Sequence, residues 1–152
     1  MHGSVSRRRD ADHHGPGDDR RGITTTAVCS VSDSPPSLLV CVNRKTATCT
    51  QISQTGRFSV QLLGDTPNEI ALAFEGARKL EGAAKFGVGR WTDTAFGQPR
   101  LLTALACLSC KALTKSDSGS YRIFVGEIEE AILVQGDALV YARSRFHRLQ
   151  VA

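Results

Sequence analysis

The histidine and cysteine side chains are the first candidates for chemistry in this sequence. His13 and His14 lie near several aspartates, as metal ligands often do, but their segment is almost wholly polar. Adjacent histidines in such a segment are usually solvated, so we predict no metal site. Cys107 and Cys110 form a CxxC pair inside a segment typical of a strand. Residues three apart on a strand point to opposite faces, so we expect packed thiols and no redox pair.

The remaining candidates give no catalytic pattern by spacing alone. His147 lies between Phe146 and Arg148 in a predicted strand, where a partly exposed histidine needs no function. No serine or cysteine has a recognisable base partner, which gives hydrolase chemistry no support. The sequence also contains neither a Walker loop nor a GxGxxG turn after a strand. A phosphate-binding P-loop and a Rossmann fold are therefore not expected.

Length and composition limit the class of protein. The 152 residues suit one domain, and no apolar run is long enough to span a bilayer. No secretory signal is visible, so we expect a cytoplasmic protein without membrane association. The net charge of +4 includes no basic stripe interleaved with aromatics, so nucleic-acid binding is not expected, whereas anionic small molecules suit the charge. The odd number of cysteines argues against a disulfide framework: Cys29, Cys41, Cys49, Cys107 and Cys110.

The elements that must position these residues begin at Gly22. Residues 1–21 are too polar to bury a core, and we predict that they are disordered. Residues 22–152 form one predicted domain, in which Pro35 and Pro36 are expected to end strand pairing. Propensity and turn residues predict strands at 23–31, 37–42, 57–63, 101–115, 121–133 and near the C-terminus, and helices opening near Thr46 and at 65–67. Residues 79–100 are expected to be irregular. The predicted class is mainly β, a barrel or sandwich with two or three helices.

Four stretches carry a resemblance to a known family. They are GITTTAVCSVSDSPPSLLVCVNR at 22–44, FEG at 74–76, YRIFVGEI at 121–128 and LVYARSRFHRL at 139–149. Together they resemble the short-chain flavin reductases, the reductase components of two-component flavin-dependent monooxygenases such as 4-hydroxyphenylacetate 3-monooxygenase. The resemblance runs through about residues 22–149, and its first stretch is long and distinctive. It implies an FMN-binding split β-barrel of Greek-key type, usually a homodimer.

The resemblance also implies a flavin site. A flavin needs hydrogen-bond donors along one ring edge, an apolar surface for the ring and a cradle for its phosphate. In the family, the isoalloxazine ring is lined by the positions of Thr24, Thr26, Ala27, Val28, Cys29 and Ser30. The phosphate is held at the positions of Asn43, Lys45, Thr46 and Thr48, where a lysine charge, hydroxyls and a helix N-terminus would meet one anion. Phe74 and Gly76 fall at a further flavin-contacting stretch.

The nicotinamide side departs from the family pattern at one position. The family usually has a glycine-acid-histidine triplet before its IFVGEV strand, whereas this chain has Gly119-Ser120-Tyr121. Tyr121 can stack or donate a hydrogen bond, but it carries no positive charge near neutral pH. Phe146 and His147, in RFHRL, match a second family motif on the nicotinamide side. Because hydride transfer depends on positioning the two rings, no side chain is expected to act as an acid or base.

The resemblance predicts an NAD(P)H-dependent flavin reductase. It would reduce free FMN or FAD with NADH or NADPH and supply a partner monooxygenase. Two alternatives stay open: a non-catalytic flavin-binding module, with Tyr121 marking a lost nicotinamide site, and an inactive truncated reductase. The second alternative arises because residues 1–21 do not match the family's first helix and strand. Without that strand, an open barrel edge is expected.

Overall fold

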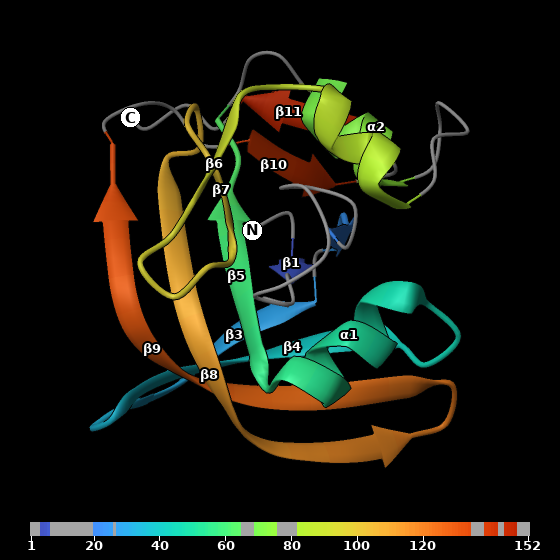
Figure 1. The fold of residues 1–152 in the computed structure, drawn as a ribbon, viewed down its shortest axis with the longest axis vertical. Helices are drawn as coiled ribbons and strands as arrows, with labels where there is room; N and C mark the ends of the chain where they lie inside the picture. Colours follow the sequence, from blue (N-terminus) through green and yellow to red (C-terminus); the bar gives the residue numbers. More distant parts are fainter. Residues whose placement is uncertain are drawn as a thin grey trace, which may run out of the picture.

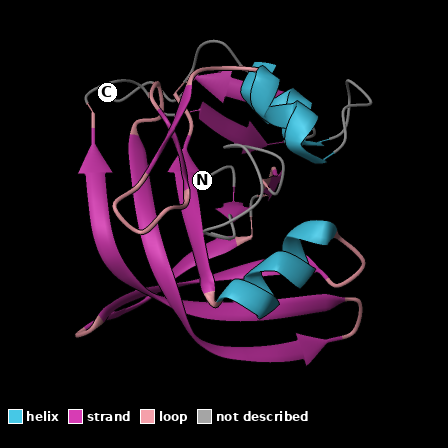
Figure 2. Cartoon of the chain, in the orientation of Figure 1, coloured by secondary structure: helices cyan, strands magenta, loops and turns pink. Residues whose placement is uncertain are grey.

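The computed structural model describes residues 4–6, 20–25, 27–64, 69–75, 82–134, 139–142 and 145–148. Strands dominate these residues, and two α-helices and one short 3-10 helix complete them (Figure 2). No helix in this part of the chain is long and apolar enough to cross a bilayer.

A seven-stranded sheet forms the body of the fold (Figure 1). Its neighbouring strands pair antiparallel in the order β2-β1-β5-β8-β9-β4-β3. The long β8–β9 hairpin bends across the molecule and pairs with β5 on one side and β4 on the other. The strands are β1 (Ser4–Ser6), β2 (Arg21–Ile23), β3 (Val28–Asp33), β4 (Pro36–Asn43), β5 (Arg57–Leu62), β8 (Ala106–Ser118) and β9 (Tyr121–Leu133).

The N-terminal segment contributes a strand that the sequence did not predict. Ser4–Ser6 form β1, which pairs with Arg21–Ile23 of β2 and with Ser59 and Val60 of β5. β5 is therefore paired on both sides, by β1 and by β8, whereas β3, in the stretch where an open edge was expected, pairs only with β4 among the described residues. The disorder predicted for residues 1–3 and 7–19 stays a prediction, because these residues lie outside the described part of the chain.

Two details of the predicted strands also change. The expected strand 23–31 is divided into β2 and β3, because Thr24 leaves the ladder and bonds to the helix at Glu69–Glu75. The prolines do not end pairing as expected, since Pro36 pairs with Asp33 as the first residue of β4. Proline is tolerated at a strand start, where its missing N–H is not needed by the ladder.

Helix α1 (Ala47–Thr55) begins and ends where its sequence requires. The Thr46 hydroxyl accepts a hydrogen bond from the Cys49 amide at 3.2 Å, which caps the N-terminus. Gly56, with φ of +68°, ends the helix in the left-handed conformation. The predicted opening near Thr46 is thus confirmed. The remaining helices are α2 (Glu69–Glu75) and the 3-10 helix η1 (Gly82–Gly87).

Strand β5 is buried on both faces, which divides the interior in two. Phe58 and Val60 join a core with Leu38, Val40, Ile52, Cys110 and Phe124. Ser59 and Gln61, on the other face, bond to the carbonyl of Pro99. That carbonyl belongs to a hairpin of β6 (Trp91–Asp93) and β7 (Pro99–Leu101), inside the stretch expected to be irregular.

Cys107 and Cys110 on β8 lie beside the two faces of β5 just described. Cys107 pairs with Gln61 and Cys110 with Phe58 in the β5–β8 register. Burial raises the pKa of the Cys107 thiol to about 11 and that of Cys110 to about 12. They lie on opposite faces of β8, as their spacing predicts.

Candidate functional site

The loop between β4 and α1 brings together the predicted phosphate-binding residues. The Asn43 side-chain oxygen accepts the Lys45 amide at 2.9 Å, and its carbonyl accepts the Thr46 hydroxyl at 2.7 Å. These bonds hold the chain in a tight turn ahead of the helix. Lys45 is exposed and Thr48 is buried in the first turn. The Thr46 hydroxyl already accepts the Cys49 amide, whereas the amides of Ala47 and Thr48 have no acceptor within the helix and are donors for an anion at this loop.

The predicted ring-lining stretch runs along the edge of the sheet. The Ala27 carbonyl accepts a hydrogen bond from the Cys41 amide at 3.0 Å. Because Cys41 lies two residues before Asn43, this stretch begins beside the phosphate loop. Val28 is half-buried, whereas Cys29 and Ser30 are exposed on edge strand β3. Their exposure leaves room for a ligand against the strand. Thr26 lies outside the described residues.

Thr24 joins this stretch to α2. Its hydroxyl donates to the Ala71 carbonyl at 2.6 Å and its amide to the Phe74 carbonyl at 3.4 Å. The structure therefore brings Thr24 and Phe74 together, although 50 positions separate them in the sequence. Gly76 lies outside the described residues.

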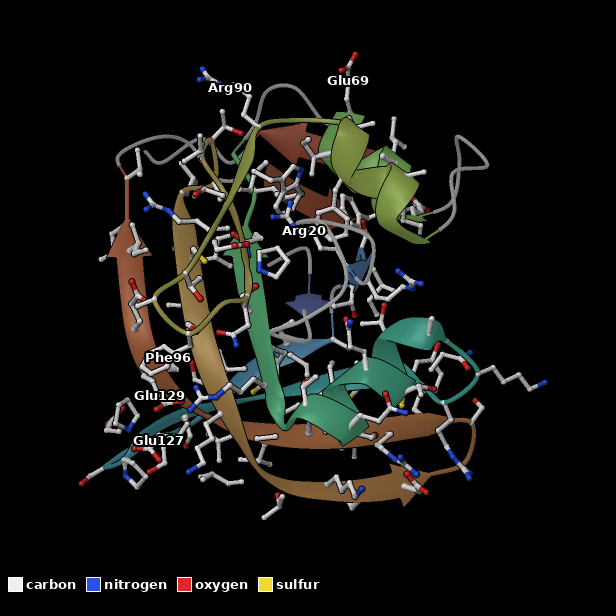
Figure 3. All side chains as sticks on the ribbon, in the orientation of Figure 1. Arg20, Glu69, Arg90, Phe96, Glu127 and Glu129 are labelled. Atoms are coloured by element: carbon white, nitrogen blue, oxygen red, sulfur yellow. The ribbon has the colours of Figure 1, made fainter. Side chains whose placement is uncertain are left out.

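An aromatic cluster with two neighbouring cations supports Phe74. The Phe74 ring lies 4.9 Å from Phe86 and 5.4 Å from Trp91, measured between ring centroids. Lys85 Nζ donates to the Phe74 carbonyl at 3.4 Å. Arg20 lies over Phe86 at 5.6 Å and forms an ion pair with Asp93 at 3.0 Å. In Figure 3, Arg20 points into the fold, whereas Arg90 and Glu69 project from its upper end.

The predicted nicotinamide residues fall in two parts of the chain. Tyr121 is half-exposed and pairs with Asn43 across β4 and β9, so it lies beside the phosphate loop. Phe146 and His147 lie in β11 (Arg145–Arg148), which pairs with β10 (Leu139–Ala142). Figure 1 shows β10 and β11 at the same end of the molecule as α2, and α1 at the other end. A single chain therefore does not bring Tyr121 together with the other two, and the three contacts stay a prediction.

A pocket of about 530 Å³ beside α1 contains residues that sequence analysis missed. Arg44 and Arg122 reach it from the phosphate loop and from β9, with Ser53 and Ser120 beside them. Arg122 Nε and Nη2 donate to the two Asp117 oxygens at 2.6 and 3.1 Å. This hydrogen bonding lowers the pKa of the Asp117 carboxyl and raises that of Arg122. Their sequence signal was weak, because Arg44 is one of two adjacent cations in NRK and Arg122 is a single cation in YRIF.

The cysteines and possible metal ligands form no further site in the described part of the chain. None of its His, Cys, Asp and Glu side chains cluster in threes around a possible metal position. All five cysteines are free thiols, and only Cys29 is exposed. Burial raises the pKa of the Cys49 thiol beside the pocket, although the nearby Arg122 charge opposes this shift.

Comparison with known proteins gives consistent matches. The sequence model of the family described as "Flavin reductase like domain" matches residues 11–150. The 4-hydroxyphenylacetate 3-monooxygenase reductase component of Pseudomonas aeruginosa is 39% identical over 132 residues, which are 86% of this chain and 78% of that protein. The FMN reductase (NADH) RutF 1 of Methylorubrum extorquens is 36% identical over 136 residues, 89% of this chain and 66% of its own length.

A solved structure gives the same result for the fold. BorF, the flavin reductase component of a bacterial two-component tryptophan halogenase, matches with a TM-score of 0.84 and 28% identity. The match covers 99% of this chain and 91% of BorF. The predicted mainly β split-barrel class with two or three helices is therefore confirmed.

Proposed function

Because this chain belongs to the flavin reductase like domain family, we propose that it is the reductase component of a two-component monooxygenase system. It transfers hydride from NADH to flavin and supplies the reduced flavin to a separate oxygenase. The family match across residues 11–150 carries this proposal. The relatives support it, one being a monooxygenase reductase component and another an NADH-dependent FMN reductase.

The residues of the site fit a flavin. When bound, flavin supplies a ring that accepts hydride, and the protein supplies position. We place the ring against the edge stretch that includes Thr24, Thr26 and Ala27–Ser30, and near Phe74 and Gly76. The phosphate contacts the loop of Asn43, Lys45, Thr46 and Thr48. The support is the donor set at this loop: an exposed ammonium group, hydroxyls and the amides of Ala47 and Thr48 at the start of α1.

Tyr121, Phe146 and His147 are proposed to contact the nicotinamide, with Tyr121 from one chain and the other two from the partner of the proposed homodimer, because one chain holds Tyr121 apart from β11. Tyr121 supports this role through its position opposite Asn43 and its exposed ring. A tyrosine orients the nicotinamide by stacking or by a hydrogen bond and gives no charge to a phosphate. NADH is proposed as the donor. NADH is a cytoplasmic metabolite, so we place the reaction in the cytoplasm.

The purified protein is expected to oxidise NADH only when FMN or FAD is added. The reason is that flavin, as a substrate, must be present before hydride has an acceptor. Loss of nicotinamide absorbance, followed with and without flavin, measures this directly, and flavin with NADH but no protein is the control. Flavin binding without NADH oxidation would select the non-catalytic module. Absence of both would contradict the proposed function.

Replacing Lys45 by alanine is expected to weaken FMN binding by about 1–3 kcal/mol, the usual size of a charge-assisted hydrogen bond. Riboflavin lacks the phosphate, so its affinity should change little. Quenching of flavin fluorescence measures both, and Lys111→Ala, an exposed lysine on β8, is the matched control. Equal losses for FMN and riboflavin would show that Lys45 does not contact the phosphate.

We also propose that the protein is a homodimer. The support is the family resemblance, in which the split barrel is usually a homodimer; the described strands also expose single apolar side chains, including Val31 on β3, Leu113 on β8 and Leu133 on β9. Light scattering is expected to give twice the 16.4 kDa chain mass at micromolar concentration. A monomer at all concentrations would contradict the proposal.

A further inference from the structure

The pocket beside α1 is separate from the stretch proposed to hold the flavin ring. Its volume of about 530 Å³ is that of a small-ligand site. Three segments surround it: the loop after β4, the outer face of α1 and the start of β9. Its lining residues are Arg44, Lys45, Cys49, Thr50, Ser53, Gln54, Ser120 and Arg122.

The charge of the pocket favours an anion. Three cations line it, and none of its lining residues is a carboxylate. The nearby carboxylate is Asp117, which Arg122 contacts with two nitrogens and Arg44 Nε approaches to 3.5 Å. One carboxylate against three cations leaves a formal charge of +2.

Both arginines are held in place before any ligand binds. Arg122 Nη1 donates to the Ser53 hydroxyl at 3.0 Å, in addition to its two bonds to Asp117. A guanidinium has five N–H donors, so two of those on Arg122 stay available. Arg44 Nη1 donates to the Gly119 carbonyl at 3.1 Å, and its amide to the Ser120 carbonyl at 2.9 Å. Fixed donors lose little freedom on binding, so the pocket is preorganised for an anion.

Lys45 connects this pocket to the proposed flavin phosphate site. It belongs to the phosphate loop and also lines the pocket. FMN ends at the phosphate held by this loop, whereas FAD continues through a second phosphate to adenosine. We propose that the pocket binds the adenosine monophosphate half of FAD, with the second phosphate on Arg44 and Arg122. This inference rests on the proposed function and makes FAD the preferred flavin.

The test compares FMN, FAD and adenosine monophosphate on the full chain. Wild-type protein should bind FAD more tightly than FMN. Arg44→Gln should lower the affinities for FAD and for adenosine monophosphate about tenfold, the effect of losing a charged hydrogen bond. FMN affinity should stay within about twofold. Arg122→Gln should act in the same direction, and thermal melting shows that each variant is folded.

Arg90→Gln is the matched control. It removes the same charge from an exposed arginine at the other end of the molecule (Figure 3). Flavin fluorescence quenching measures FMN and FAD, and calorimetry measures adenosine monophosphate. With saturating FMN as the flavin, the KM for NADH should be unchanged in Arg44→Gln.

Three results would overturn the proposal. Unchanged FAD affinity in both arginine variants would leave the pocket without this role. Equal losses for FMN and FAD would assign Arg44 to the flavin phosphate itself. A raised KM for NADH with unchanged FAD affinity would assign the pocket to the nicotinamide dinucleotide. If wild-type protein bound no flavin but bound adenosine monophosphate through Arg44, the proposed function would fail and the adenylate site would stand.

Discussion

Replacing Gly126 by valine is expected to destabilise the protein by about 3 kcal/mol or more, because the substitution overpacks the core. Gly126 lies on β9 where β8, β9 and β5 pack together. A Cβ atom at this position would lie 2.6 Å from Phe58 Cζ and 3.0 Å from Cys110 Cβ. Phe58 is fully buried, so its ring has no open space to move into. Denaturant unfolding followed by tryptophan fluorescence measures the loss.

Two further variants test this explanation for Gly126. Gly87→Val is the control, because a Cβ there meets no atom within 4 Å, and its cost should stay below about 1 kcal/mol. Phe58→Leu combined with Gly126→Val should recover part of the lost stability, since leucine leaves room where the Phe58 ring would meet the valine. Equal costs at Gly126 and Gly87 would show that the effect comes from the backbone and not from the Phe58 ring.

Replacing Gln61 by leucine is expected to cost about 2–3 kcal/mol and to weaken flavin binding as well. Its Oε1 accepts the buried Leu101 amide at 3.1 Å, and its Nε2 donates to the Pro99 carbonyl at 3.0 Å. Leucine keeps the volume but leaves that amide without an acceptor. Gln61 also borders a narrow cavity with Thr24, Phe74 and Trp91, so a loosened β6–β7 hairpin should disturb the proposed flavin contacts.

Chemical unfolding and flavin titration of the same Gln61→Leu sample measure the two effects. Gln54→Leu, at an exposed position of α1, is the stability control and should change the free energy of unfolding by less than about 0.5 kcal/mol. Lower stability with unchanged flavin affinity would show that the β6–β7 hairpin does not support the proposed flavin contacts. Unchanged stability would contradict the role assigned to the amide network.

Local signals in the sequence predicted the elements that depend on neighbouring residues. Thr46 and Gly56 cap α1 with their own side chain and backbone conformation, and both positions can be identified without tertiary structure. Strands β4 and β9 contain long apolar or β-branched runs. The family resemblance added the barrel class, which periodicity alone left open between barrel and sandwich.

Features that depend on distant residues were not predictable in this way. Ser59 and Gln61 look like the solvent face of an ordinary strand, but the β6–β7 hairpin covers them and satisfies their polar groups. The hairpin itself lies in a stretch whose glycines suggested irregular chain. β1, with the sequence SVS, has no hydrophobic pattern that would predict it, and its backbone pairs with β2 and β5. The cationic pocket needs Arg44 and Arg122, which only the register of Asn43 with Tyr121 brings together.

The pairing of β4 with β9 determines when the site forms during synthesis. Its ladder joins Asn43 to Tyr121 and Ser37 to Glu127, partners that lie about 80 to 90 positions apart in the chain. Contacts of this kind form only after the whole intervening segment is available, which slows folding. The phosphate loop is anchored to the β8–β9 turn through Ser120 and Gly119, so it is held in place only when that turn has left the ribosome. A nascent chain therefore completes the proposed flavin phosphate site late, after most of its sequence has been translated.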